Sequence, residues 1–372
     1  MNAAPCSPLT QIPRSLICAE DYAERAPAHM TPEAWAFFSG AAGDESTHRR
    51  NRAAIERLLL QSRVLTAMQA ANTAVTLFGS TYSHPILVAP IAYQRLAHPD
   101  GEIAMAMGSS AIGAGMVVST QASASLASIA AATDIAPWFQ LYMQPDRDHS
   151  VALIERAEQT GYGAIVVTLD APINGVRRRE HRAAFALPPD ISAVNLAGMR
   201  TPAPHTARLD EPPLFGTPLL SAMPTWADLV WLRAQTALPL IVKGITAPDD
   251  ALRALDVGAN GIIVSNHGGR VLESQPGTFE QLPRIAKTLS GQATLLVDGG
   301  IQSGSAIVKA LALGANAVLV GRPMVYALAV AGALGVAHLL HILRAELEST
   351  MVLTGCPTLE HIGPHVLFET TQ

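Results

Sequence analysis

Aromatic and charged residues are both scarce in this sequence. Of its 372 residues, 5% are aromatic and 15% are charged, whereas 49% are hydrophobic. Such a composition provides for a large buried core. The formal net charge is −5, and the basic residues form no stripe of the kind that nucleic-acid-binding proteins present. We therefore expect a large globular protein without a nucleic-acid partner.

Cysteine is scarce too, and long apolar runs are missing. Cys6, Cys18 and Cys356 are scattered, so they form neither a disulfide framework nor a metal-binding spacing. The N-terminus lacks the basic and apolar segments of a secretory signal peptide. The longest apolar candidate, residues 327–340, is interrupted by two glycines and falls short of the roughly 18 residues that a membrane helix needs. We expect a cytoplasmic protein with no membrane partner and no metal.

The sequence does contain eight short apolar runs, each of which ends in polar or small residues. Near-continuous runs of this kind are typical of parallel strands that are buried on both faces. Helical stretches, such as residues 151–159 and 226–235, separate them. Eight strand–helix units predict an α/β fold of the TIM (β/α)8 barrel type, with a doubly wound open sheet as the alternative. The runs are 86–90, 116–120, 138–142, 164–170, 240–244, 261–267, 295–300 and 317–322.

An N-terminal extension precedes the first of these runs. Residues 1–30 contain several prolines and little periodicity, so we expect a loose arm there and a single domain over residues 31–372. Thr31 and Pro32 suit the N-cap and the first position of a helix. A second helix is expected from Ser46 to about Leu59, which makes the extension helical.

A long proline-rich segment, residues 182–223, separates the fourth and fifth predicted strands. Proline lacks a backbone donor, which discourages helices and central strands. Long loops without periodicity are usually lids, binding loops or disordered segments. In a barrel this loop would leave the C-terminal face, where active sites lie. We favour a lid, with a packed structural excursion as the alternative; a membrane-binding role is disfavoured because the segment is not strongly apolar.

Polar residues end almost every predicted strand. The C-terminal ends of barrel strands converge on one mouth, and buried polar groups require partners, so stability alone does not explain this pattern. The glycine-rich turns 298–300 and 321–323 follow the last two strands and are typical of a barrel phosphate site. The polar residues at the strand ends are Ser119, Gln140, Tyr142, Thr168, Asp170, Lys243, His267, Arg270, Asp298 and Arg322.

The most distinctive strand end is the hexapeptide Ser265-Asn266-His267-Gly268-Gly269-Arg270. It places an acid/base group beside a fixed cation, although a solvated glycine turn is the structural alternative. Asp170 can orient this histidine as a base. Together with Arg177, the arginine of the hexapeptide can bind a carboxylate. Lys243 can hold negative charge that develops on a cofactor, or it can form an ion pair with Asp298.

These motifs resemble those of the FMN-dependent 2-hydroxy acid oxidases and dehydrogenases, a family that includes glycolate oxidase, lactate oxidase and mandelate dehydrogenase. The resemblance rests on the hexapeptide followed by Leu282-Pro283, on Val242-Lys243-Gly244 and on the two glycine-rich turns. It covers about residues 31–362. It implies an FMN-binding barrel, the oxidation of an (S)-2-hydroxy acid to the 2-oxo acid, and a homotetramer.

The resemblance also implies a role for each matching residue. His267 would be the base, taking a proton from the α-carbon or from the hydroxyl, according to whether a carbanion or a hydride route operates. Asp170 would stabilise its charged form. Arg177 and Arg270 would bind the substrate carboxylate. The other implied roles are a hydrogen bond to the substrate oxygen for Tyr142, stabilisation of the reduced flavin for Lys243, and flavin contacts for Ala89, Pro90, Ile91, Ala92, Ser119, Gln140, Thr168, Ser265, Asp298, Gly300, Gly321 and Arg322.

Four positions bear on the electron acceptor and the substrate. Ala92 stands where family oxidases tend to carry alanine and membrane dehydrogenases glycine, which favours O2 as acceptor and hydrogen peroxide as product. The alternatives are a dehydrogenase that uses a quinone or another carrier, and a flavin-binding barrel with altered activity.

The remaining three positions bear on the substrate and the phosphate. Phe37 replaces a tyrosine that helps to bind the carboxylate, and the missing hydrogen bond lowers the binding free energy by about 1.5–3 kcal/mol. Gln121 replaces a tryptophan of the substrate pocket, and Gln302 an arginine beside the phosphate. We therefore expect a larger, aryl or unusual 2-hydroxy acid.

Overall fold

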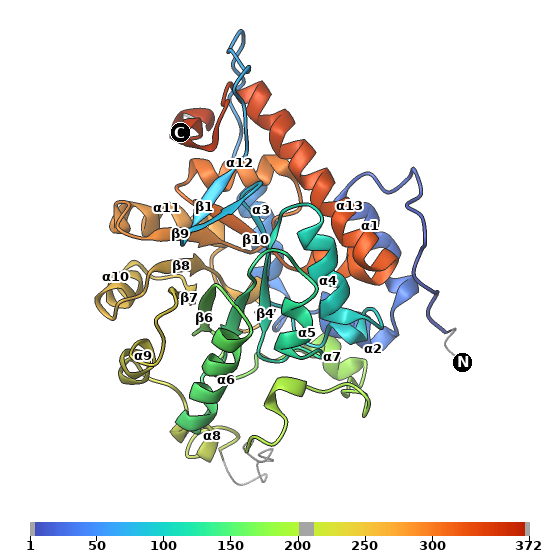
Figure 1. Ribbon diagram of the computed structural model, residues 1–372, viewed down its shortest axis with the longest axis vertical. Coiled ribbons are helices and arrows are strands. Elements are labelled where there is room, and N and C mark those ends of the chain that lie inside the picture. Colours follow the sequence, from blue (N-terminus) through green and yellow to red (C-terminus); the bar gives the residue numbers. More distant parts are fainter. Residues whose placement is uncertain (1–3, 201–211, 369–372) are drawn as a thin grey trace.

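Eight parallel strands close into a barrel in the computed structural model, which describes residues 4–200 and 212–368 (Figure 1). The strands follow one another in chain order, and the last, β10, pairs with the first, β3, through Val320 and Val88. This closure confirms the predicted TIM barrel and rules out an open sheet. The strands are β3 (Ile86–Val88), β4 (Gly115–Ser119), β5 (Trp138–Leu141), β6 (Ala164–Thr168), β7 (Leu240–Ile245), β8 (Gly261–Val264), β9 (Thr294–Val297) and β10 (Ala317–Val320).

Helices follow the strands and cover the outside of the barrel (Figure 1). The predicted helices at 151–159 and 226–235 correspond to α6 and α9. A barrel of this kind buries its strands on both faces, which is why they form continuous apolar runs in the sequence. The covering helices are α4 (Gly101–Ser110), α5 (Leu126–Ala130), α6 (Arg147–Gln159), α9 (Trp226–Arg233), α10 (Pro248–Asp256), α11 (Thr278–Leu289), α12 (Gly304–Ala312) and α13 (Arg322–Thr354).

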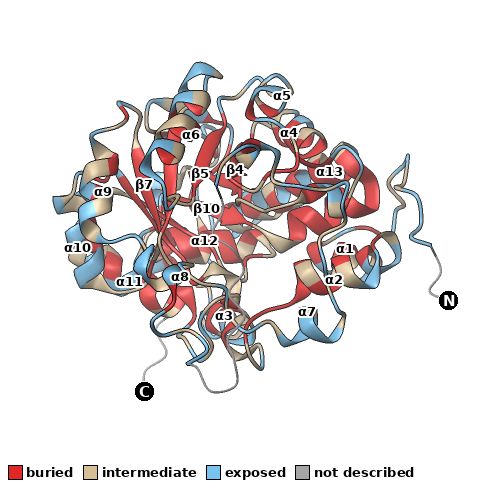
Figure 2. Cartoon of the chain, turned by 90° about the horizontal axis from the view of Figure 1, so that it is seen from below, coloured by how far each residue is buried: buried red, intermediate tan, exposed pale blue. Residues whose placement is uncertain are grey.

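The core has two layers, one inside the barrel and one between strands and helices (Figure 2). The inner layer continues into a hairpin, β1 (Val75–Leu77) and β2 (Ser80–Tyr82), that we did not predict. At this hairpin the rings of Phe78 and Trp138 lie 5.4 Å apart in an edge-to-face arrangement. Because Trp138 begins β5, the hairpin closes the N-terminal end of the barrel, opposite the polar strand ends.

The N-terminal extension is helical and better ordered than we expected. It contains α1 (Ala19–Arg25), a short 3-10 helix (Ala26–His29), α2 (Pro32–Ser39) and α3 (Ser46–Glu56). The Thr31 side chain accepts the N–H of Ala34 at 3.2 Å, as predicted for the N-cap of α2. The prediction of a loose arm was wrong from about Leu16 onward. Tyr22 is fully buried, and its hydroxyl lies 2.9 Å from Nδ1 of His338 on α13, so tertiary packing orders this segment.

Helix α7 (Arg178–Arg182) leads into the predicted lid segment, which contains a 3-10 turn (Val194–Leu196) and the short helix α8 (Pro218–Ser221). Its residues 201–211 lie outside the described part of the chain. Phe185, Leu196 and Ala222 line the mouth of the barrel. The segment therefore covers the expected face, and its movement as a lid stays a prediction.

Helix α13 is the longest element and one of the most apolar. By length and composition alone it could cross a membrane, with a mean hydropathy of 1.8 over its most apolar window. In this fold 67% of that window is buried, and the helix packs against α4, α12 and α1. Ala331 and Gly332 depart from helical geometry and divide it. The contacts with the neighbouring helices account for its apolar surface.

Candidate active site

A cavity of about 710 Å³ opens at the C-terminal end of the barrel. Its volume lies within the range of roughly 300–1,000 Å³ that is usual for small-molecule and cofactor sites. All but two of the predicted site residues line it; Asp170 and Ser265 stand behind the wall. The predicted residues in the lining are Phe37, Ala89, Pro90, Ile91, Ala92, Ser119, Gln121, Gln140, Tyr142, Thr168, Arg177, Lys243, His267, Arg270, Asp298, Gly300, Gly321 and Arg322, joined by Gln302.

His267 and Asp170 form the acid/base pair of this cavity. His267 Nδ1 lies 2.9 Å from Asp170 Oδ1, which leaves Nε2 as the ring nitrogen that can accept a proton. The backbone N–H of His267 also donates to Ser265 Oγ at 3.1 Å. Burial raises the pKa of Asp170, but the nearby charges of His267 and Lys243 outweigh it, so this pKa is lowered overall. The Asp170 carboxylate is therefore ionised and can stabilise a positively charged His267.

Lys243 is a buried, fixed positive charge at the centre of the site. Its Nζ lies 3.1 Å from Asp298 Oδ2 and donates to Ser265 Oγ at 2.8 Å. The ion pair that the sequence left open is thus present, and Lys243 still lines the cavity. Burial lowers the pKa of Lys243, but attraction to Asp298 and Asp170 more than compensates, and its pKa is raised. The ammonium group stays charged and can face negative charge in the cavity.

Arg177 and Arg270 lie together at the rim, joined by a residue that the sequence did not reveal. Glu180 Oε1 lies 3.3 Å from NH1 of Arg177 and 3.1 Å from NH2 of Arg270. NH1 of Arg270 also donates to the carbonyls of Phe37 and Gly40, each at 2.7 Å. Burial, reinforced by repulsion from Arg177 and Arg322, lowers the pKa of Arg270 to about 9. The only signal for Glu180 in the sequence was its spacing of three residues after Arg177.

Aromatic rings form the wall beside this arginine pair. The rings of Phe37 and Phe185 are stacked with centroids 4.8 Å apart, and Tyr93 lies 6.2 Å from Phe37. The Arg270 guanidinium lies 5.3 Å from the Phe37 ring centroid. Gln121 and Tyr142 also line this part of the cavity, and burial raises the pKa of Tyr142, so its hydroxyl stays protonated. Phe185 and Tyr93 were not predicted: Phe185 has no motif beside it, and Tyr93 lies one residue beyond the predicted flavin contacts at positions 89–92.

The glycine-rich turns after β9 and β10 also line the cavity. Gly300 has a φ of +84°, and a side chain there would come within 3.1 Å of Asn51 on α3. Arg322 lines the cavity, but its guanidinium donates to the carbonyls of Phe38 (3.1 Å), Gly40 (2.8 Å) and Gly268 (2.9 Å). Its predicted contact with a phosphate would therefore compete with bonds inside the protein.

Two further side chains near these turns, those of Arg52 and His48, were not predicted from the sequence. Arg52 of α3 donates a short hydrogen bond to Gln302 Oε1, which brings a cation behind this part of the lining. His48 lines the cavity beside Arg322. Burial, with repulsion from Arg322, Arg179 and other arginines, lowers the pKa of His48 to about 3. His48 is therefore neutral at physiological pH.

The cavity suits a bound FMN on several independent grounds. Residues 89–92 (Ala-Pro-Ile-Ala) offer an apolar wall for a flat ring. The buried Nε2 of Gln140 and Oδ1 of Asp298 have no hydrogen-bond partner within the described chain, so they can bond to a ligand. Lys243 supplies the positive charge and the glycine turns supply backbone N–H groups. In residues 4–200 and 212–368, no cluster of His, Cys, Asp and Glu could hold a metal ion.

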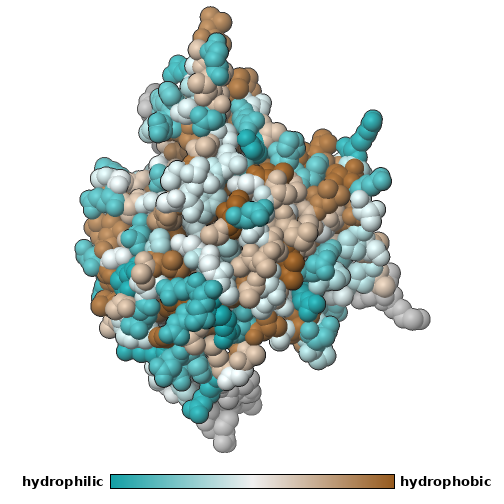
Figure 3. All heavy atoms as spheres, viewed as in Figure 1, coloured by the Kyte–Doolittle hydropathy of each residue, from teal (hydrophilic) through white to brown (hydrophobic). Residues whose placement is uncertain are grey.

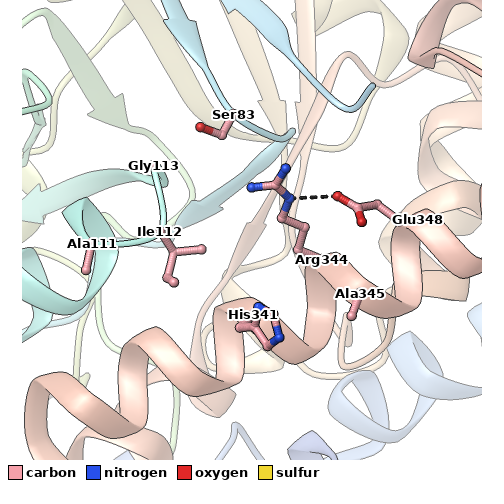
Figure 4. Close-up of a pocket in the computed structure, with 8 residues that line it drawn as sticks. All are labelled: Ser83, Ala111, Ile112, Gly113, His341, Arg344, Ala345 and Glu348. Atoms are coloured by element: carbon pink, nitrogen blue, oxygen red, sulfur yellow. Dashed lines mark hydrogen bonds and ion pairs between the residues drawn. The ribbon is translucent and has the colours of Figure 1, made fainter. Parts of the chain in front are cut away.

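A second, smaller cavity of about 430 Å³ lies at the other end of the barrel (Figure 4). Ser83 and Gly113, which precede β3 and β4, form one side, and α13 forms the other. Its cation, Arg344, is engaged by Glu348 at 2.8 Å. It contains no acid/base pair comparable to that of the first cavity, and we assign the chemistry to the C-terminal end.

A TIM barrel whose mouth combines a histidine–aspartate pair, a buried lysine and a glycine-rich cradle defines a flavin-dependent oxidoreductase. The chain belongs to the FMN-dependent dehydrogenase family, whose sequence model matches residues 26–369. FMN is accordingly its cofactor.

Named oxidases are among its relatives. The chain is 46% identical to an L-lactate oxidase of Alicycliphilus denitrificans, covering 96% of this chain and 97% of that protein. It is 42% identical to a 4-hydroxymandelate oxidase of Amycolatopsis orientalis, covering 90% and 94%. A solved structure of mandelate oxidase with benzoyl-formic acid superposes with a TM-score of 0.85 at 40% identity, covering 95% of this chain and 98% of the other. These relatives act on different 2-hydroxy acids.

Proposed function

We propose that the protein oxidises an (S)-2-hydroxy acid to the 2-oxo acid, with O2 as electron acceptor and hydrogen peroxide as product. The observation that carries the proposal is the convergence of the His267–Asp170 pair, Lys243 and the Arg177–Arg270 pair on one cavity. Simple binding of a flavin would not need this combination of base, fixed charge and carboxylate-binding groups. The names of the relatives support the same reaction.

Each residue has a defined task in this reaction. Arg177 and Arg270 bind the substrate carboxylate through charge-assisted hydrogen bonds. His267 Nε2 takes one proton from the substrate, and Asp170 stabilises the imidazolium that results. FMN, when bound, supplies the acceptor for the two electrons that the substrate loses. The positive charge of Lys243 would stabilise the negative charge that the bound cofactor gains when it is reduced.

The aromatic wall supports a substrate with a bulky, preferably aryl, side chain. Phe37, Tyr93 and Phe185 present ring surfaces beside the arginine pair, where the side chain of a bound 2-hydroxy acid would lie. Apolar and aromatic surfaces favour ligands that remove them from water. We therefore propose that aryl 2-hydroxy acids such as mandelate are better substrates than lactate.

Anaerobic flavin reduction tests the reaction directly. The purified protein should be yellow, and an (S)-2-hydroxy acid should bleach it in the absence of air, whereas the (R)-enantiomer should not. His267→Ala should abolish bleaching and retain the yellow colour. If flavin is bound and no hydroxy acid of a broad panel reduces it, the reaction is wrong.

The electron acceptor is a separate question with a separate assay. Stoichiometric hydrogen peroxide in air would support O2, which the alanine at position 92 favours. A low peroxide yield with fast reduction of a quinone or dye would instead support a dehydrogenase. Ala92→Gly tests the contribution of this position, since it widens the cavity wall without adding a polar group.

A homotetramer and a cytoplasmic location are proposals as well. Exposed apolar side chains cluster on the segment that protrudes between α3 and β1, where Val64 is 82% and Leu65 101% exposed (Figure 3). Nearby, Leu353 and Phe368 are also exposed, and an interface between subunits would remove all four from water. Mass photometry and cell fractionation measure the two properties.

A further inference from the structure

Helix α7 brings a carboxylate to the two arginines that face the substrate. Arg177 precedes the helix, and Glu180 lies three residues further on, so both side chains project from the same side. Glu180 Oε1 contacts both guanidinium groups, at 3.3 Å for Arg177 and 3.1 Å for Arg270. Only 11% of the Glu180 side chain is exposed, against 15% for each arginine. The three groups form one partly buried cluster, which we call the carboxylate clamp.

Each of the other acidic groups of the site has a different partner. Asp170 pairs with His267, and Asp298 pairs with Lys243. On the outer side of α7, Glu45 and Asp44 pair with Arg179 and Arg178. Glu180 is thus the acidic residue of the described chain that pairs with Arg177 and Arg270. Two guanidinium charges minus one carboxylate charge leave the clamp with a net charge of +1.

The hydrogen bonds of the clamp leave room for one further anionic group. NH1 of Arg270 is taken by two backbone carbonyls, and NH2 of Arg177 donates to Asn174 Oδ1 at 2.8 Å. The Nε of Arg177 is buried and finds no acceptor in the part of the chain that the structure describes. A single substrate carboxylate bound at the clamp would neutralise the remaining charge. The second negative charge of a dianion would not be neutralised by the clamp and would be repelled by the Glu180 carboxylate.

We propose that Glu180 is a positioning and specificity-determining residue that selects substrates with a single carboxylate over dicarboxylates. It holds the two guanidinium groups together and fixes the net charge of the clamp at +1. This inference rests on the proposed function, because it takes Arg177 and Arg270 as the groups that bind the substrate carboxylate. It adds that Glu180 sets the net charge of the clamp, and that this net charge determines whether a substrate with one or with two carboxylates is bound.

The test compares oxamate and oxalate, which have nearly the same shape and differ by one negative charge. Both are titrated into the FMN-loaded protein, and binding is followed by the change in flavin absorbance, without turnover. In Glu180→Gln the affinity for oxalate relative to oxamate should rise on the order of tenfold, the size expected for one unit charge at short range in a partly buried site. If Glu180 had a purely structural role, Glu180→Gln would lower the affinities for oxalate and oxamate equally and leave their ratio unchanged.

Two further variants make the result decisive. Glu180→Asp keeps the charge, so both ligands should weaken while their ratio stays within about twofold. Asp44→Asn removes an exposed carboxylate that pairs with Arg178 on the same helix, and it should change neither affinity. An unchanged ratio in Glu180→Gln, or a tenfold change in Glu180→Asp, would overturn the proposal. Reduction of the wild-type flavin by 2-hydroxy acids decides the proposed function independently of these ratios.

Discussion

Asp170 and His267 stand at the ends of β6 and β8, and their side chains meet 2.9 Å apart across the end of β7. The strand between them carries Lys243, whose charge helps to keep Asp170 ionised. The Asp170 carboxylate therefore interacts both with the imidazole of His267 and with the charge of the Lys243 ammonium group. This arrangement follows from the barrel, which brings the ends of three successive strands to one place.

Asp170→Asn should slow flavin reduction and leave FMN bound. The amide cannot stabilise a protonated His267, so the limiting rate of anaerobic reduction should fall by roughly 10²–10⁴-fold, the usual contribution of general acid–base catalysis. Rapid-mixing spectrophotometry measures this rate. Asp250→Asn, at an exposed position on α10, is the control and should reduce at the wild-type rate. An undiminished rate in Asp170→Asn would remove this carboxylate from the mechanism.

Phe185→Ala should discriminate between aryl and small substrates. Phe185 stacks on Phe37, and its removal should lower kcat/KM for mandelate by roughly 10–100-fold, since a buried aromatic contact contributes about 1.5–3 kcal/mol. For lactate, whose methyl group makes little contact with the ring, the loss should be much smaller. Steady-state peroxide assays measure both values. Phe215→Ala, at a side chain that is 78% exposed, serves as control. Equal losses for the two acids would contradict an aryl pocket.

Much of the site could be predicted because it depends on local patterns. Each strand is an apolar run, and nearly all of them have a polar end, so the barrel and the meeting of Asp170 with His267 follow from the order of these runs. Arg322 illustrates what could not be predicted. Its guanidinium bonds to Phe38 and Gly40, which reach the mouth only through the folding of the N-terminal extension. Glu180 was missed for a similar reason, since its contact with Arg270 joins residues 90 positions apart.

The protein should lose stability on acidification partly through His48. Its folded-state pKa of about 3 lies below the ordinary value of 6.5, so the unfolded chain binds more protons between these two pH values. The free energy of unfolding therefore rises with pH in this window, and the contribution of neutral His48 is complete above pH 6.5 and lost as the pH falls towards 3. His48→Gln should flatten the dependence of Tm on pH between about 6.5 and 4. A slope as steep as that of the wild type would exclude His48 as a source.

Arg52→Ala should weaken the binding of FMN but not of riboflavin. Arg52 bonds to Gln302, which lines the cavity beside the glycine-rich turns, while the Arg322 guanidinium is occupied by three carbonyls. Arg52 also pairs with Glu20 at 3.1 Å and with Glu56 at 3.4 Å, so a phosphate would have to compete with these carboxylates. This competition and the 38% exposure of the Arg52 side chain limit the expected effect to about 3–10-fold in Kd. Fluorescence titration of the apoprotein measures both ligands, which differ only in the phosphate. Arg57→Ala, an exposed neighbour that pairs with Glu280, should bind both as the wild type does. If Arg52→Ala weakens FMN and riboflavin equally, the arginine supports the fold of α3 and does not contact the phosphate.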